Sequence, residues 1–178
     1  MKKNVCFSRL TRIPLAAAFM CVIAPLALPI GGIPFTLGTF SLYLIALCFS
    51  PIDAFAILVL YIGIGAVGMP VFSGFSGGAQ MLIGPTGGFL LAYPFVSFLI
   101  SFVGGGYKGG FARWFFALLL GTILLYVCGG IVYLFVTDTP FCISILWLFL
   151  PLFIADFLKM AAALFIFLRL APFLEKKG

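Results

Sequence analysis

Long apolar runs, separated by short polar or glycine-rich segments, make up almost the whole chain. Residues 54–107 carry no charged side chain, and between Asp138 and Arg169 the only charged residues are Asp156 and Lys159. A helix needs roughly 20 apolar residues to cross a bilayer. The pattern therefore predicts an all-α integral membrane protein, a bundle of six transmembrane helices over about residues 13–28, 36–49, 52–67, 84–103, 111–136 and 151–170.

The composition narrows the class of protein. Of 178 residues, 65% are hydrophobic and only 8% are charged, whereas a soluble domain carries about 25% charged residues. We therefore expect a single membrane domain over residues 1–178. The formal charge of +6 does not indicate nucleic acid binding, because the basic residues fall in short loops and at the termini. The chain contains no His, which removes the usual general base and metal ligand.

The basic residues predict the orientation of the bundle. With six spans, both termini and the segment between the fourth and fifth helices lie on one side of the membrane. Cytoplasmic loops carry an excess of Lys and Arg, so that side and both termini are predicted to be cytoplasmic. Nine of the ten basic residues fall there, namely Lys2, Lys3, Arg9, Arg12, Lys108, Arg113, Arg169, Lys176 and Lys177.

The tenth basic residue, Lys159, lies inside the last apolar run. The acidic residue nearest to it, Asp156, lies in the same run. At a spacing of three residues their side chains share one face of a helix. An ionisable residue at membrane depth costs a few kcal/mol and normally faces the bundle interior or a wet cavity. The pair is therefore a candidate binding site for a charged ligand that opens outward. The alternative is an ion pair that satisfies itself and only fixes the helix.

A glycine-rich outer segment, over about residues 69–83, is the second candidate region. Nine of the 21 glycines lie between Gly63 and Gly88, a density that a continuous helix does not tolerate. Irregular backbone at membrane depth either lines a cavity or is buried in protein. For Gly63, Gly65 and Gly68 we favour close helix packing. The candidate ligand-lining residues are Phe72, Ser73, Phe75, Ser76, Gln80 and Thr86, together with Thr36 and Thr39, which open the second helix and could cap it instead.

Several short motifs occur in an order that resembles one known family. They are Ile33-Pro34-Phe35-Thr36-Leu37, Gly68-Met69-Pro70-Val71-Phe72, Phe75-Ser76-Gly77-Gly78, Gly84-Pro85-Thr86-Gly87-Gly88-Phe89, and Pro151 followed by Asp156-x-x-Lys159. On these motifs the chain resembles the BioY family, the biotin-binding S components of energy-coupling factor (ECF) vitamin transporters of prokaryotic plasma membranes. The resemblance covers about residues 13–171. It departs from the family at Gly38, where many relatives have Gln.

The resemblance implies a function and a set of partners. It implies a multi-pass S component that binds biotin from the outer face, with Asp156 and Lys159 in the site. It also implies docking on a transmembrane T component energised by two cytosolic ATPases, and no cofactor or chemistry of its own. The first helix would make the docking contact, and its small residues there are Ala16, Ala17, Ala18 and Cys21.

Three other readings of the sequence stay open. The chain could be an S component for another small carboxylated vitamin. It could be an intramembrane enzyme that uses Asp156 as acid or base, although it has no His and no second buried carboxylate is predicted. It could also be a structural or assembly subunit whose outer loops only pack. Ligand binding by the purified protein separates the first reading from the last.

Overall fold

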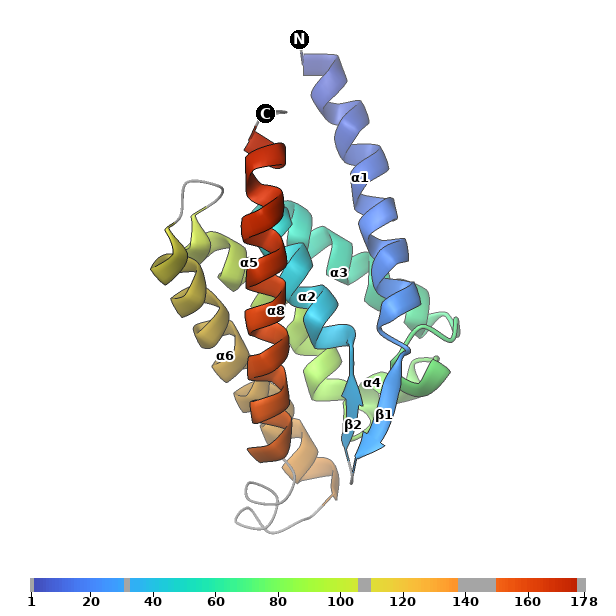
Figure 1. The fold of residues 1–178 in the computed structure, drawn as a ribbon. Coiled ribbons are helices and arrows are strands. Elements are labelled where there is room, and N and C mark those ends of the chain that lie inside the picture. The colour runs from blue at the N-terminus through green and yellow to red at the C-terminus, as the bar shows by residue number, and fades with distance from the viewer. Residues whose placement is uncertain (1, 31–32, 106–109, 138–149, 176–178) are drawn as a thin grey trace.

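The computed structural model describes residues 2–30, 33–105, 110–137 and 150–175. Long helices run side by side, and a short antiparallel β-hairpin lies at one end of the bundle (Figure 1). In chain order the elements are α1 (Lys2–Ile23), β1 (Ala27–Ile30), β2 (Ile33–Thr36), α2 (Gly38–Cys48), α3 (Pro51–Ala66), η1 (Ser73–Phe75), α4 (Gln80–Ile83), α5 (Gly87–Gly104), α6 (Phe111–Thr137) and α8 (Leu150–Glu175).

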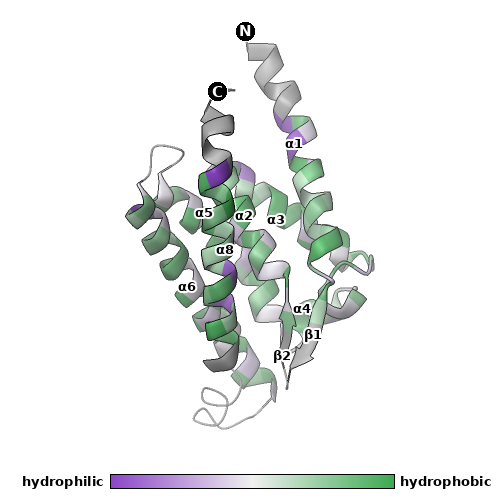
Figure 2. Cartoon of the chain, in the orientation of Figure 1, coloured by the Kyte–Doolittle hydropathy of each residue, from purple (hydrophilic) through white to green (hydrophobic). Residues whose placement is uncertain are grey.

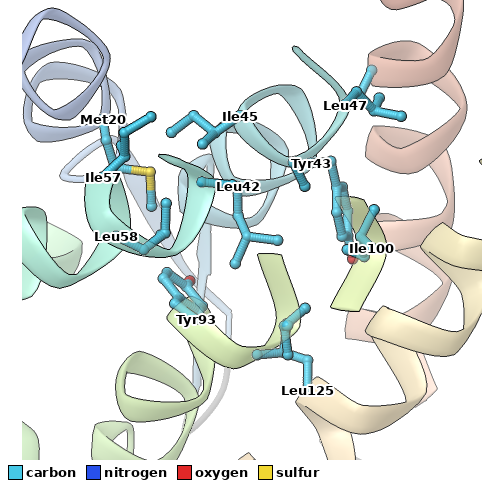
Figure 3. Close-up of a cluster of buried hydrophobic side chains, with 14 of the residues drawn as sticks. Met20, Leu42, Tyr43, Ile45, Leu47, Ile57, Leu58, Tyr93, Ile100 and Leu125 are labelled. Atoms are coloured by element: carbon cyan, nitrogen blue, oxygen red, sulfur yellow. The ribbon is translucent and has the colours of Figure 1, made fainter. Parts of the chain in front are cut away.

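The two ends of the bundle differ. α1 begins, α8 ends, and α5 passes to α6 at one end, whereas the hairpin and α4 lie at the other (Figure 1). α2 is short and central. It places Leu42, Tyr43, Ile45 and Leu47 in the buried core, where they meet apolar side chains of α1, α3, α5 and α6 (Figure 3). Its 11 residues rise only about 17 Å, and the hairpin extends the bundle beyond the start of α2 (Figure 1).

Apolar residues make up most of each helix (Figure 2), and many large apolar side chains are exposed, which fits a lipid environment. α6 illustrates this, because one face of it exposes Phe116, Leu120, Ile123, Val127 and Ile131 at the three- and four-residue spacing of a helix. Among the described helices, α5 and α6 are long and apolar enough to cross a bilayer by themselves.

The first helix and its connection to the second differ from the sequence expectation. Predicted over about residues 13–28, the helix instead spans Lys2–Ile23. It continues through Pro14, because one proline removes a single hydrogen bond and does not oblige a helix to stop. It ends before Pro25, whose ring disfavours helical backbone at the preceding residue. The next residues form the hairpin, in which Pro29 lies opposite Pro34, so the fold is helical apart from these two strands.

The other predicted helices are confirmed within a few residues, except at two ends. α8 continues five residues beyond 170, to Glu175. α5 begins at Gly87 rather than at about residue 84, because Pro85 separates it from the short α4. The segment predicted as an outer loop over about residues 69–83 contains η1 and α4. It is therefore ordered backbone, although it is not one continuous helix.

Candidate functional site

Asp156 and Lys159 lie on the buried face of α8. The Lys159 Nζ is 2.8 Å from Asp156 Oδ1, and the side chains are 9% and 4% exposed, respectively. The i, i+3 spacing brings the two side chains together as the sequence predicts. The two charges therefore form a buried ion pair in the middle of an otherwise apolar helix.

Each hydrogen of the Lys159 ammonium has an acceptor within the protein. Besides Asp156, the Nζ donates to the Thr36 carbonyl oxygen at 2.6 Å and to the Thr39 Oγ1 at 3.1 Å. It also lies 3.8 Å from the centre of the Phe35 ring, a cation–π distance. An ammonium has three N–H donors, so this arrangement uses all of them and ties α8 to β2 and α2.

The Asp156 carboxylate is equally well supplied with donors. Its Oδ1 accepts from the Thr39 hydroxyl at 2.8 Å as well as from Lys159, and its Oδ2 accepts from the Tyr126 hydroxyl at 2.8 Å. Burying an ion pair costs several kcal/mol per charge unless such bonds satisfy it. We call Thr39, Tyr126, Asp156 and Lys159 the polar cluster. It joins α2, α6 and α8.

The polar cluster forms part of the wall of a cavity. The space between the lining residues, with the open mouth included, is about 660 Å³. Most of the wall is apolar or aromatic, as in small-molecule pockets generally. The lining residues are Ala24, Phe35, Thr36, Gly38, Thr39, Tyr61, Phe72, Ser73, Met81, Thr86, Phe89, Leu90, Tyr93, Leu125, Tyr126, Leu152, Asp156 and Lys159.

Glycines allow two aromatic rings to reach the cavity wall. A methyl group at Gly65 would overlap the ring of Phe72, which is fully buried and packs edge-on against Tyr61 at 5.6 Å. A methyl group at Gly129 would overlap the ring of Phe89 in the same way. Close packing therefore holds for Gly65, against the Phe72 ring. It is wrong for Gly63 and Gly68, where an added methyl group would meet no atom within 4 Å.

The structure brings most of the predicted site residues together. Those that line the cavity are Thr36, Thr39, Phe72, Ser73, Thr86, Asp156 and Lys159. Thr36 is not the N-cap of α2, which is Leu37. Its hydroxyl accepts from the Gly38 N–H at 3.2 Å, and its carbonyl oxygen accepts from Lys159.

Three predicted residues lie away from the cavity wall. Phe75 is 64% exposed, and the Ser76 hydroxyl donates to the Ser73 carbonyl oxygen at 2.8 Å. Gln80 is exposed, and its amide reaches only the Gly77 carbonyl oxygen, at 3.5 Å. An antiparallel bridge joins Phe72 to Ser76, so Phe75 lies in a tight turn with its ring exposed.

Sequence reasoning missed several lining residues, of which the tyrosines Tyr61, Tyr93 and Tyr126 are the most polar. The Tyr126 hydroxyl belongs to the polar cluster, and the Tyr93 side chain hydrogen-bonds to that of Thr36. The sequence does carry a signal for these residues, namely a tyrosine within a long apolar run. A tyrosine buried there needs a hydrogen-bond partner for its hydroxyl group, which indicates a polar site nearby. For metal ligands, the described residues contain no group of three His, Cys, Asp or Glu side chains close enough to hold an ion.

The predicted docking residues on α1 face different ways. Ala17 is 1% exposed and Ala16 is 9% exposed, whereas Ala18 is exposed and Cys21 is half-buried. Ala16 borders an apolar groove of about 710 Å³ on the membrane-facing side, between α1, α2 and α8. The residues along this groove are Arg12, Leu15, Ala16, Phe19, Leu44, Ile45, Cys48, Phe49 and Ile166.

Known proteins match this chain over nearly its whole length. The profile of the BioY family matches residues 1–176. A relative from Lactococcus lactis subsp. cremoris, named biotin transporter BioY2, is 34% identical over 157 residues, covering 88% of this chain and 86% of the relative. The biotin transporter BioY of Thermotoga maritima is 35% identical over 154 residues, covering 86% of this chain and 89% of the relative.

A solved structure has the same fold. It is the crystal structure of the S-component for biotin from an ECF-type ABC transporter, which superposes with a TM-score of 0.84 at 26% sequence identity. The superposition covers 96% of this chain and 94% of that one. The bundle with its β-hairpin therefore has the S-component fold.

Proposed function

The chain belongs to the BioY family, and from this premise we propose that it is the biotin-binding S component of an ECF-type transporter. The relatives named as biotin transporters and the fold shared with a biotin S component support this function. The observation that carries the proposal is the polar cluster of Thr39, Tyr126, Asp156 and Lys159, set in the wall of a mostly apolar cavity.

The chemistry of the cavity matches that of biotin. Biotin has a ureido ring with two N–H donors and one carbonyl acceptor, an apolar thiophane ring, and a valerate carboxylate. Asp156 is an acceptor for the ureido N–H groups, because among the described residues its Oδ2 receives only the Tyr126 bond, and each carboxylate oxygen accepts about two. The rings of Phe72 and Phe89 give the thiophane apolar walls.

The role proposed for the chain is substrate capture within a larger transporter. In that role it has no chemistry of its own, takes biotin as ligand without a cofactor, and leaves ATP hydrolysis to two cytosolic ATPases. The T component is proposed to pack against the exposed face of α1, where Ala18 lies, and along the groove bordered by Ala16. Ala17 packs inside the bundle instead, and Cys21 lies at the edge of that face.

The proposed topology has six spans in one membrane domain, with both termini in the cytoplasm. α1 begins and α8 ends at the same end of the bundle (Figure 1), as an even number of spans requires. Arg9, Arg12 and Arg169 lie towards this end of their helices, which agrees with the excess of positive charge on cytoplasmic sides. The hairpin and α4 then lie on the outer side, and the cavity opens outward.

Calorimetric titration of the detergent-purified protein with biotin tests the function. We expect tight one-to-one binding by the unaltered protein. Asp156→Asn should weaken binding roughly a hundredfold, because a charge-assisted hydrogen bond is lost and Lys159 loses its counter-charge. The matched control is Asp53→Asn, since Asp53 pairs with Arg9 at 3.6 Å at the start of α3 and does not line the cavity.

Two results would contradict the proposal in different ways. If the folded, unaltered protein gives no heat with biotin, the ligand is wrong, and other small carboxylated vitamins become the next candidates. If it binds biotin and Asp156→Asn binds equally well, the function stands and the assignment of Asp156 fails.

A further inference from the structure

Ser73 carries a buried hydroxyl group that has no hydrogen-bond partner among the described residues. Its Oγ is inaccessible to solvent, and the residue lines the cavity. Leaving a buried donor unsatisfied costs about 1–3 kcal/mol, so such groups in native proteins usually have a functional reason or bind something not part of the chain. Ser73 nevertheless lines the proposed ligand site, so a change of its side-chain rotamer would bring the hydroxyl to the cavity.

Three hydrogen bonds fix the backbone around Ser73. The Phe72 N–H donates to the Ser76 carbonyl oxygen at 2.9 Å, and the Ser76 hydroxyl donates to the Ser73 carbonyl oxygen at 2.8 Å. The Gly74 N–H donates to the carbonyl oxygen of Pro25, at 3.0 Å. Phe75 has a φ of 58°, a left-handed conformation that a bulky residue keeps only when its surroundings impose it. The loop therefore holds the Ser73 backbone in place beside the cavity.

The polar cluster, in contrast, has no donor to offer a ligand carboxylate. All three N–H groups of Lys159 are engaged, by Thr36, Thr39 and Asp156. The hydroxyl hydrogens of Thr39 and Tyr126 are engaged by Asp156. A second carboxylate placed there would also meet the negative charge of Asp156. The cluster is thus suited to the N–H donors of a ligand, and the carboxylate has to be bound elsewhere in the cavity.

We propose that the Ser73 Oγ–H donates a hydrogen bond to the carboxylate of the ligand, while the ligand N–H groups face Asp156. This inference rests on the proposed function and adds the direction in which biotin lies. It assigns the valerate end to the η1 loop and the ureido ring to α8. It also makes Lys159 a residue that positions Asp156, rather than the group that binds the carboxylate.

Ser73→Ala separates this role from a structural one, because the two predict opposite effects on stability. Removing an unsatisfied hydroxyl should leave the thermal midpoint of the ligand-free protein unchanged or slightly higher. The affinity for biotin should nevertheless fall about thirtyfold, the size of a hydrogen bond to a charged group. For biotinamide, whose carboxylate is replaced by a neutral amide, the same substitution should cost only about threefold.

Ser97→Ala is the matched control. Ser97 is fully buried on α5, its hydroxyl donates to the Pro94 carbonyl oxygen at 2.9 Å, and it does not line the cavity. This variant should lose thermal stability and keep its affinity for biotin. Equal affinity of Ser73→Ala and the unaltered protein for biotin would overturn the Ser73 assignment alone. Equal losses for biotin and biotinamide would overturn the carboxylate assignment. An unaltered protein that binds no biotin would overturn the proposed function and this inference with it.

Discussion

At the scale of single residues, several hydrogen bonds fix the position of the Asp156 carboxylate in the cavity wall. Asp156 receives bonds from Thr39, Tyr126 and Lys159, which belong to three different helices. A site held this way from several elements loses little entropy when it binds its ligand, because the binding group is already ordered. The lysine and the phenol thus contribute to ligand binding through the geometry of Asp156.

Tyr126→Phe tests that contribution. The substitution keeps the ring, which lies 6.0 Å from Phe89 and 5.8 Å from Phe153, and removes the hydroxyl that donates to Asp156. We expect the affinity for biotin to fall about tenfold, because a bond to a charged group is worth about 1.5 kcal/mol or more. Titration calorimetry gives the affinity, with Tyr133→Phe on the same helix as the control, since Tyr133 does not line the cavity. Unchanged affinity would mean that Thr39 and Lys159 alone orient the carboxylate.

The sequence predicts some residues of this site better than others, for a physical reason. Asp156 and Lys159 stand out because charge is costly in an apolar run. Ser73 does not stand out from Ser76, since both are serines in one glycine-rich loop and only the three-dimensional turn decides which hydroxyl faces inward. Tyr126 gives a weak signal, because a tyrosine in an apolar helix is as common in ordinary cores as in ligand sites.

At the scale of elements, the long helices follow from apolar length, whereas the hairpin does not. The strands Ala27–Ile30 and Ile33–Thr36 are four residues each, too short to show an alternating pattern, and they continue directly from an apolar helix. Pro25 is the residue that ends α1 early. The hairpin matters for the site, because β2 carries Phe35 and Thr36 to the Lys159 ammonium.

α1 has a buried face and an exposed face, and the exposed face is where we expect the T component to dock. Ala18→Trp places a large side chain on that face, where the small alanine would allow close helix approach. We expect the amount of T component that co-purifies with the chain to fall several-fold, while biotin affinity is unchanged because Ala18 does not line the cavity. Ile123→Trp, on the exposed face of α6, is the control. Equal co-purification of both variants would place the docking surface elsewhere.

At the scale of the whole molecule, the distribution of charge and the position of the cavity are linked. Arg9 and Arg12 lie on the opposite half of α1 from the hairpin, and Arg169 lies far along α8 from Asp156. If the basic end faces the cytoplasm, the cavity lies in the outer half of the membrane. A substrate-capture subunit needs this arrangement, because its ligand arrives from outside.

Labelling with a membrane-impermeant maleimide tests the topology directly. In a variant without its native cysteines, Gln80→Cys should react in intact cells, because Gln80 is exposed on α4 at the proposed outer end. Lys176→Cys, near the C-terminus, should react only after the cells are permeabilised. Since Gln80 does not line the cavity, each variant should still bind biotin, which confirms that the labelled protein is folded. The reverse labelling pattern would place the cavity on the cytoplasmic side, and the chain could then not capture biotin from outside.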